Sequence, residues 1–168
     1  MPKAMQPLRD EHKELLPHIE ELRVVADSVG ETSTKDLQES VGKAHDFLTH
    51  HLIPHAEAED HALYPMVERV QGASKATQTM SRDHVEVGKL TKELGTLKEQ
   101  LATALPGDWV FKELRRVLYG LYSVVKLHFA KEEEIYLPLL DKGLTPSEAR
   151  RMFEVMEKMA QEAKAKMA

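Results

Sequence analysis

The chain has 168 residues, of which 42% are hydrophobic and 30% are charged, so one globular domain with a continuous core is expected. Its apolar runs are too short for a membrane helix, which needs about 18 residues, and the N-terminal segment lacks the apolar core of a secretion signal, so we expect a cytoplasmic protein. Because the chain has no cysteine, disulfides and thiolate metal sites are excluded, and any metal must be bound through nitrogen and oxygen. The net charge of −5, with basic residues scattered among acidic ones, argues against a nucleic-acid partner.

The first two predicted helices are joined by a short polar loop. Apolar residues at helical spacing predict a helix from about Pro7 to Ser28, and its apolar face also carries His12. Capping residues predict that a second helix begins at Ser33 or Thr34. The apolar pattern of this second helix continues until it ends or bends near Pro65.

Two further long helices follow. The third should be capped by Ser74 and run to about Leu101. The pair Pro106-Gly107 then breaks the pattern. Asp108 should cap the fourth helix, which ends between residues 138 and 143.

Four helices of this length with short connections predict an all-α fold, an up-down-up-down antiparallel four-helix bundle over residues 1–143. Residues 144–168 add a fifth helix, whose start is marked by Thr145, Pro146 and the Glu148 of a capping box. Methionines form the apolar edge of this helix, which is more often a packing feature than a cofactor site. The helix packs on the bundle or on a partner subunit, so a homodimer stays open.

A pattern of histidine and glutamate occurs twice, in repeats that cover about residues 8–66 and 80–139. In each repeat, one histidine is followed 43 or 44 residues later by a second, and a glutamate stands four residues beyond that. Four residues are about one helical turn, so the second histidine and the glutamate share a helix face. The six positions are His12, His55 and Glu59 in the first repeat and His84, His128 and Glu132 in the second.

Burying four imidazoles and two carboxylates in one bundle would be costly unless something neutralised them, and bound cations do so. Imidazole nitrogens and carboxylate oxygens are ligands that suit iron, manganese or zinc. The pattern therefore predicts a two-metal site inside the bundle.

Other residues near these six leave alternatives open. His51 lies one turn before His55, so it is a candidate additional ligand or a partner of a ligand. Glu133 competes with Glu132 if a π-bulge brings it onto the histidine face, although the repeat favours Glu132.

Three more residues adjoin the pattern. Asp60 is expected to face solvent or to support a ligand. Tyr64 and Tyr136, which precede prolines at the ends of the two motifs, are expected to pack near the end of the bundle.

In residue type and order, the six positions resemble the hemerythrin-like family, the HHE cation-binding domain, over about residues 8–140. The resemblance implies a four-helix bundle that holds two oxo- or hydroxo-bridged irons, with Glu59 and Glu132 as bridging carboxylates and the four histidines divided between the metals. Oxygen-carrying hemerythrins have a second histidine on the third helix, where this chain has Gly88, and they place the last carboxylate five residues after its histidine. Reversible oxygen carriage is therefore not expected unless His51 supplies the missing nitrogen.

Two function classes follow. The first is a non-haem di-iron protein that binds or senses oxygen, nitric oxide or peroxide. The second is a di-iron enzyme that decomposes peroxide or reduces nitric oxide, and iron storage ranks behind both. Manganese or zinc could occupy the same donors. A ferritin-like site is excluded because no histidine has a glutamate three residues before it.

Overall fold

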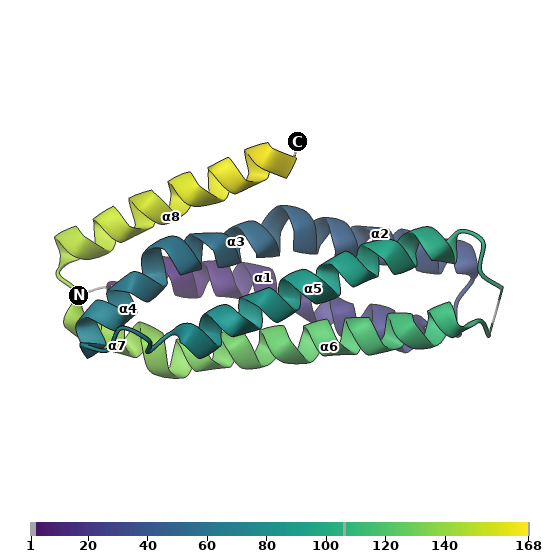
Figure 1. Cartoon of the computed structure of the whole chain (residues 1–168), viewed down its shortest axis with the longest axis horizontal. Helices are drawn as coiled ribbons and strands as arrows, with labels where there is room; N and C mark the ends of the chain where they lie inside the picture. The colour runs from purple at the N-terminus through teal and green to yellow at the C-terminus, as the bar shows by residue number, and fades with distance from the viewer. Residues whose placement is uncertain (1–2, 106, 168) are drawn as a thin grey trace.

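The computed structural model describes residues 3–105 and 107–167, and all regular structure in these residues is helical (Figure 1). Residues 1, 2, 106 and 168 lie outside the described part, and with them the proline of the predicted break. Three of the elements are π-helical turns, written η. The elements are α1 (Gln6–Ser28), α2 (Thr34–Phe47), η1 (Leu48–Leu52), α3 (Ile53–Ala58), η2 (Glu59–Leu63), α4 (Tyr64–Gln71), α5 (Gln78–Leu101), α6 (Trp109–Lys131), η3 (Glu132–Tyr136), α7 (Leu137–Gly143) and α8 (Pro146–Met167).

Four long rods form the bundle: α1, the continuous run from α2 to α4, α5, and the continuous run from α6 to α7 (Figure 1). Neighbouring rods contact each other along α1 and α6, α5 and α6, α2 and α5, and α1 and α2. The predicted all-α fold, a four-helix bundle with an additional C-terminal helix, is confirmed. Helix α8 lies outside the four rods, along α3 and η2 (Figure 1).

Several helix ends follow from local hydrogen bonds. The N–H of Asp36 donates to the hydroxyl of Ser33 at 3.1 Å, which caps α2 as expected. Gly72 has a φ of 68°, the left-handed conformation that ends α4 at low cost for glycine. At the start of α8, the N–H of Glu148 donates to Thr145 Oγ1 at 3.3 Å and the N–H of Thr145 donates to Glu148 Oε2 at 2.8 Å, so the predicted capping box is present.

One predicted cap was wrong, and another has the predicted position without the capping hydrogen bond. Ser74 lies in a turn, and α5 begins only at Gln78. Asp108 occupies the predicted N-cap position directly before α6, but its carboxylate accepts a hydrogen bond from the N–H of Leu105 at 2.8 Å and makes none to the helix. The carboxylate of Asp108 therefore stabilises the preceding loop and does not cap the N-terminus of α6.

The second rod does not end at Pro65 but continues to Gln71. The π turns explain how a helix can continue past a proline. Each of the three π turns is followed two residues later by a proline, namely Pro54, Pro65 and Pro138. A proline inside a helix lacks an N–H and crowds the carbonyl four residues before it. A wider turn relieves this crowding, so the rod continues through the proline with one extra residue in the turn.

The apolar core has two parts, one on each side of a polar layer. The larger part fills the bundle from Ile19 and Val25 on α1 to Phe129 on α6. The smaller part includes Leu8 and Leu137 and is covered by α8. On every rod, the six predicted site residues fall in sequence between members of these two parts. Apolar packing therefore encloses them from both ends.

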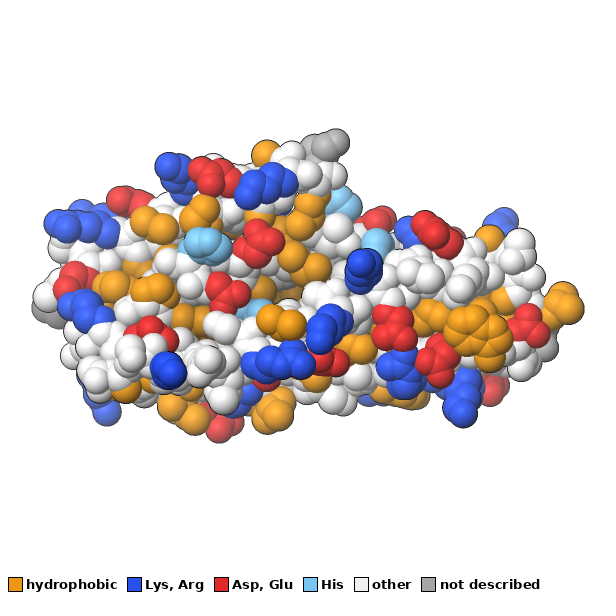
Figure 2. Space-filling model, viewed as in Figure 1, with side chains coloured by type: hydrophobic (Ala, Val, Ile, Leu, Met, Phe, Trp, Pro, Cys, Tyr) orange, Lys and Arg blue, Asp and Glu red, His pale blue; other side chains and the backbone are white. Residues whose placement is uncertain are grey.

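One face of the molecule carries charged side chains of both signs. On the face shown in Figure 2, acidic and basic side chains are interspersed and apolar side chains appear as scattered groups. Among the described residues, no helix combines the length and the apolar character that crossing a membrane requires.

Candidate metal centre

The six residues predicted from the sequence converge on one buried place in the bundle, and we call them the His/Glu cluster. Glu59 and Glu132 are 0% exposed, and His12, His55 and His128 are 4% exposed. His84 is only slightly more accessible, with 9% of its side chain exposed. Each rod contributes at least one member: His12, then His55 and Glu59, then His84, then His128 and Glu132.

Glu59 lies in the middle of the cluster, and its two oxygens face different pairs of histidines. Oε1 lies 2.9 Å from His55 Nε2 and 3.8 Å from His12 Nε2. Oε2 lies 3.2 Å from His84 Nε2 and 3.8 Å from His128 Nε2. One carboxylate therefore spans two pairs, which we call the His12–His55 half and the His84–His128 half.

Glu132 repeats this arrangement from the fourth rod. Its Oε2 lies 3.3 Å from His12 Nε2, and its Oε1 lies 3.2 Å from His128 Nε2. In the second half, the Nε2 atoms of His84 and His128 are 2.9 Å apart. Each half thus gathers two imidazole nitrogens and one oxygen from each of the two carboxylates, and the sequence repeat appears as an approximate twofold symmetry.

A carboxylate holds each histidine from the outside, at Nδ1. We call Glu11, Asp60, Asp83 and Glu133 the outer carboxylates. Each of them stands next in sequence to a member of the cluster but pairs with a histidine on a different rod. The Nδ1 contacts are His12 with Glu133 at 2.7 Å, His55 with Glu11 at 2.9 Å, His84 with Asp60 at 3.0 Å and His128 with Asp83 at 2.9 Å.

These contacts fix the orientation of the rings. An ionised carboxylate can only accept a hydrogen bond, so Nδ1 keeps its proton and Nε2 is turned toward the centre as a free donor atom for a metal. The sequence identified Asp60 as a candidate supporting group and Glu133 as a competing ligand. Glu11 and Asp83 were missed, although each stands directly before a histidine of the repeat. Glu133 faces the outer side of His12, away from the centre.

Without a metal, the cluster balances charge with protons. Burial lowers the pKa of His12, but interactions with the carboxylates of Glu132 and Glu59 outweigh burial and raise the pKa to about 9. The same balance raises the pKa of His128 to about 10. For Glu59, burial raises the pKa, but the charge of His55 and interactions with the other surrounding imidazoles hold it well below its usual value.

Several buried polar atoms of the cluster still lack a well-aligned hydrogen bond. This observation bears on whether the residues present fit bound cations. The Nε2 atoms of His12 and His55, both oxygens of Glu59, and Oε2 of Glu132 make no hydrogen bond of good geometry, although they face one another at 2.9 to 3.8 Å. Unpaired buried donors and acceptors are costly. Each half contains a set of three donor atoms that could hold a metal ion, and within each set the atoms lie within 4.8 Å of one another. The donor chemistry and the unsatisfied atoms both fit bound cations.

Tyr64 enters the cluster, which the sequence did not predict. Its hydroxyl donates to Glu132 Oε1 at 2.8 Å and lies 3.0 Å from His128 Nε2 and 3.3 Å from His84 Nε2. On a regular helix, a residue five positions after Glu59 would lie on a different face of the helix. The π turn η2 has an i to i+5 hydrogen bond, from the N–H of Tyr64 to the carbonyl of Glu59, and this brings Tyr64 onto the same face as Glu59. The packing role expected for Tyr64 was therefore incomplete.

Tyr136 and His51 lie outside the cluster. Tyr136 donates to the carbonyl of Ala76 at 3.4 Å, so it has the packing role that was expected. His51 is exposed, and its ring stacks on Phe47 with centroids 6.1 Å apart. The π turn η1 includes His51 and adds a residue before His55, so the two imidazoles do not share a face as a regular helix predicts.

Metal binding should release protons, so the apparent affinity should rise with pH. In the metal-free cluster, His12 and His128 have pKa values raised to about 9 and about 10, and they hold protons at neutral pH. A metal needs the neutral imidazole, so affinity should increase up to about pH 10 and then level off. Calorimetric titration with Zn²⁺ at neutral pH, in buffers of different ionisation enthalpy, should show at least one proton released per ion. A proton count near zero would contradict this prediction.

The comparison with protein families agrees with the geometry. Residues 4–140 match the model of the hemerythrin HHE cation-binding domain, and this range includes all six members of the cluster and all but the last three residues of the four rods. Neither the search of curated proteins nor the search of solved structures returned a match. Since the family model covers most of the chain, this protein belongs to the hemerythrin HHE cation-binding domain family.

Proposed function

We propose that the His/Glu cluster binds two iron ions, one in each half, and that this site binds or senses a small molecule such as oxygen, nitric oxide or peroxide. One observation carries the proposal: Glu59 and Glu132 each direct one oxygen to each half, as bridging carboxylates would. The four histidines complete two equal sets of donors. Manganese and zinc accept the same donors, so metal analysis must identify the ion.

The roles of the chain follow from the geometry. His12 and His55 would hold one ion and His84 and His128 the other, while the outer carboxylates fix the direction of each ring. Iron, when bound, supplies the redox change and an exchangeable coordination position. The two apolar cores above and below the cluster keep bulk water from the donors.

The test is a ligand titration of the iron-loaded protein. The protein is reduced without oxygen, and nitric oxide is added in steps while the absorption spectrum is followed. We expect saturable binding at no more than two molecules per chain, together with loss of the signal in Glu59→Ala. An iron-loaded protein whose spectrum responds to neither nitric oxide nor peroxide would overturn the proposed function.

A second candidate is an enzyme that decomposes peroxide, and Tyr64 is the observation that favours it. A hydroxyl that donates to Glu132 Oε1 at 2.8 Å inside a buried metal-binding cluster can deliver a proton to a leaving oxygen. Burial and the charges of Glu59 and Glu132 raise the pKa of Tyr64 far above its usual value, so the hydroxyl keeps its proton at neutral pH. A binding protein does not require such a donor.

Replacing Tyr64 by phenylalanine should separate the two candidates. If the protein is an enzyme, Tyr64→Phe should slow peroxide decomposition by about 100-fold, the lower range for loss of a positioned acid, with metal content unchanged. Oxygen evolution measured with an electrode gives the rate. Tyr136→Phe is the matched control, because the hydroxyl of Tyr136 bonds to Ala76 outside the cluster and its loss should leave the rate unchanged. Equal rates in all three proteins would exclude the proton-donor role.

A further inference from the structure

The His/Glu cluster is closed to solvent, so an incoming metal ion can reach it only if a side chain moves. The six members are at most 9% exposed, and the two apolar cores close the cluster from both ends. On its sides stand the four histidine rings, each held at Nδ1 by an outer carboxylate. The entry point is therefore expected where an outer carboxylate releases its histidine most easily.

Glu11 is the least restrained of the four outer carboxylates. Its side chain is 48% exposed, whereas those of the other three are between 25% and 35% exposed. Within the described residues, its one hydrogen-bonding or ion-pair partner is His55. Each of the other three has a second partner: Arg9 for Glu133, Lys131 for Asp83 and Ser81 for Asp60. An outer carboxylate thus moves with the smallest loss of contacts at Glu11.

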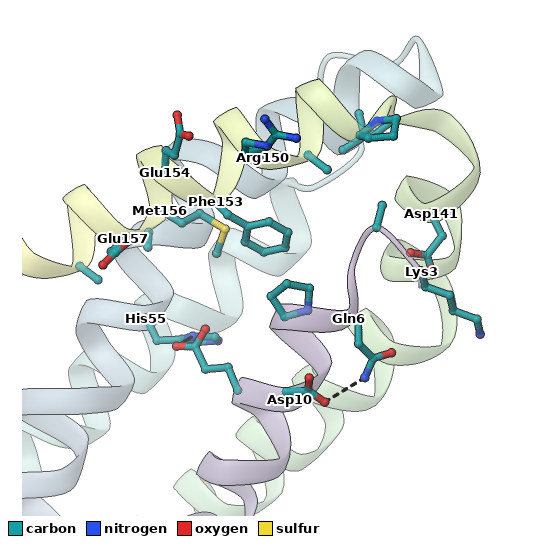
Figure 3. A pocket seen from close by; sticks show the side chains of 18 of the residues that line it. Lys3, Gln6, Asp10, His55, Asp141, Arg150, Phe153, Glu154, Met156 and Glu157 are labelled. Carbon is teal, nitrogen blue, oxygen red and sulfur yellow. Dashed lines mark hydrogen bonds and ion pairs between the residues drawn. The ribbon is translucent and has the colours of Figure 1, made fainter. Parts of the chain in front are cut away.

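A cleft lies on the outer side of Glu11 and His55. It has a volume of about 1270 Å³ and runs between α1 and α8. Of the six cluster members, His55 is the one that lines this cleft, and Glu11 stands in the same wall. Figure 3 shows His55 extending from α3 into the space between α1 and α8, with Phe153 and Met156 above it. The ring of His55 therefore has space to turn into once Glu11 releases it.

The charge of the cleft favours cations. Five carboxylates line it, against three cationic side chains. The carboxylates belong to Asp10, Glu11, Asp141, Glu154 and Glu157. In Figure 3, Glu157 of α8 lies on the His55 side of the cleft, whereas Lys3 lies at the other end beside Asp141. A cleft with an excess of one charge concentrates counter-ions and raises their association rate, so this cleft should attract divalent cations.

We infer that divalent metal ions enter the cluster through the cleft between α1 and α8, with the carboxylate of Glu11 as their first ligand. This inference rests on the proposed function, which requires a metal-loaded cluster. When the carboxylate of Glu11 binds the incoming ion, Nδ1 of His55 loses its acceptor and the ring is free to turn into the cleft. The ion then passes to the inner donors, and Glu11 returns to Nδ1 of His55. The same carboxylate thus captures the ion and opens the way.

The role of Glu11 is tested by the rate at which metal-free protein takes up Co²⁺, an ion that suits the same donors and absorbs visible light when bound. Glu11→Gln should lower the second-order association rate constant at least tenfold in stopped-flow mixing, whereas Asp83→Asn should lower it less than threefold. Both variants lose a charged support of a histidine, so both should release Co²⁺ faster, and the association rate is the quantity that discriminates. Equal slowing in the two variants, or none in Glu11→Gln, would overturn the inference.

A conservative replacement separates capture from a structural effect. Glu11→Asp keeps a carboxylate at the cleft wall and should associate with Co²⁺ within about threefold of the original rate. Circular dichroism of the metal-free variants should show the same helix content as the original chain. Association as slow in Glu11→Asp as in Glu11→Gln would show that the charge is not what matters, and it would overturn the role of Glu11 as first ligand.

The route through the cleft is tested by a charge reversal that leaves all donors in place. At about 0.1 M ionic strength, where the screening length is about 10 Å, Glu157→Lys should slow Co²⁺ association at least threefold, and the difference should disappear near 1 M. Glu99→Lys is the matched control, because it changes the net charge equally at an exposed position near the opposite end of the bundle, and it should leave the rate unchanged (Figure 1).

The outcomes separate the route from the proposed function. Equal rates in Glu157→Lys and Glu99→Lys would overturn entry through the cleft, even if the chain binds Co²⁺ fully at equilibrium. A chain that binds no Co²⁺ at equilibrium would instead defeat the metal site on which the proposed function depends.

Discussion

Glu59→Ala and Glu132→Ala should each remove most of the bound metal, whereas Glu133→Ala should remove far less. Glu59 and Glu132 direct oxygens into both halves of the cluster, so losing either takes an anionic donor from both metal positions. Within the cluster, Glu133 contacts the outer nitrogen of His12, and losing such a supporting contact typically costs 10–100-fold in metal affinity. Elemental analysis of proteins loaded at a metal concentration well above the Kd gives the occupancy.

Two controls accompany this comparison. Circular dichroism must show that all three variants stay helical, because unfolding would also release metal. Glu59→Gln keeps the size of the side chain and should lose metal as Glu59→Ala does, since a neutral amide is a poor substitute for a bridging carboxylate. Equal loss from Glu132→Ala and Glu133→Ala would show that Glu133 turns into the centre, and would contradict the geometry.

The reduced, iron-loaded protein should not carry oxygen reversibly and should oxidise readily in air. The four histidines are divided two and two between the halves, so neither ion would have the three-histidine cap that the oxygen-carrying relatives use to saturate one iron. Gly88 provides no ligand at the expected position, and His51 is exposed and stacked on Phe47. Both ions would therefore be accessible to further ligands.

The measurement for oxygen carriage is a cycle of oxygen and vacuum. The protein is reduced without oxygen, oxygen is admitted, and the spectrum is followed as the gas is removed and returned. We expect a one-way change to the oxidised spectrum. An absorption band that disappears under vacuum and returns with oxygen, over repeated cycles, would show that a carrier site forms despite the two-and-two division.

Much of the fold was predictable because it depends on local patterns. Apolar periodicity located the four rods, and the capping box of Thr145 and Glu148 located α8. The six cluster residues were predictable for a different reason. The repeat places the same residue types at the same helical spacing twice, and burial of so many polar groups calls for a shared partner.

The features that were not predicted arise where the helices depart from regular geometry. A sequence projected at 3.6 residues per turn cannot show the extra residue of a π turn, so Tyr64 was placed outside the cluster and His51 beside it. The prolines that follow each π turn were visible in the sequence, but the direction in which they shift a side chain was not. The pairing of Glu11 with His55 depends on the contact of two rods, which a linear pattern does not encode.

The most direct test of the central claim is the number of metal ions that one chain binds. Metal-free protein is titrated with Fe²⁺ under anaerobic conditions, unbound iron is removed, and the iron and protein concentrations are measured separately. Exposure to air should then produce the absorption of a bridged diferric pair. The two-half arrangement predicts saturation at about two irons per chain, with both lost together in Glu59→Ala. Saturation at one iron per chain, or two irons without the bridged-pair absorption, would contradict the account.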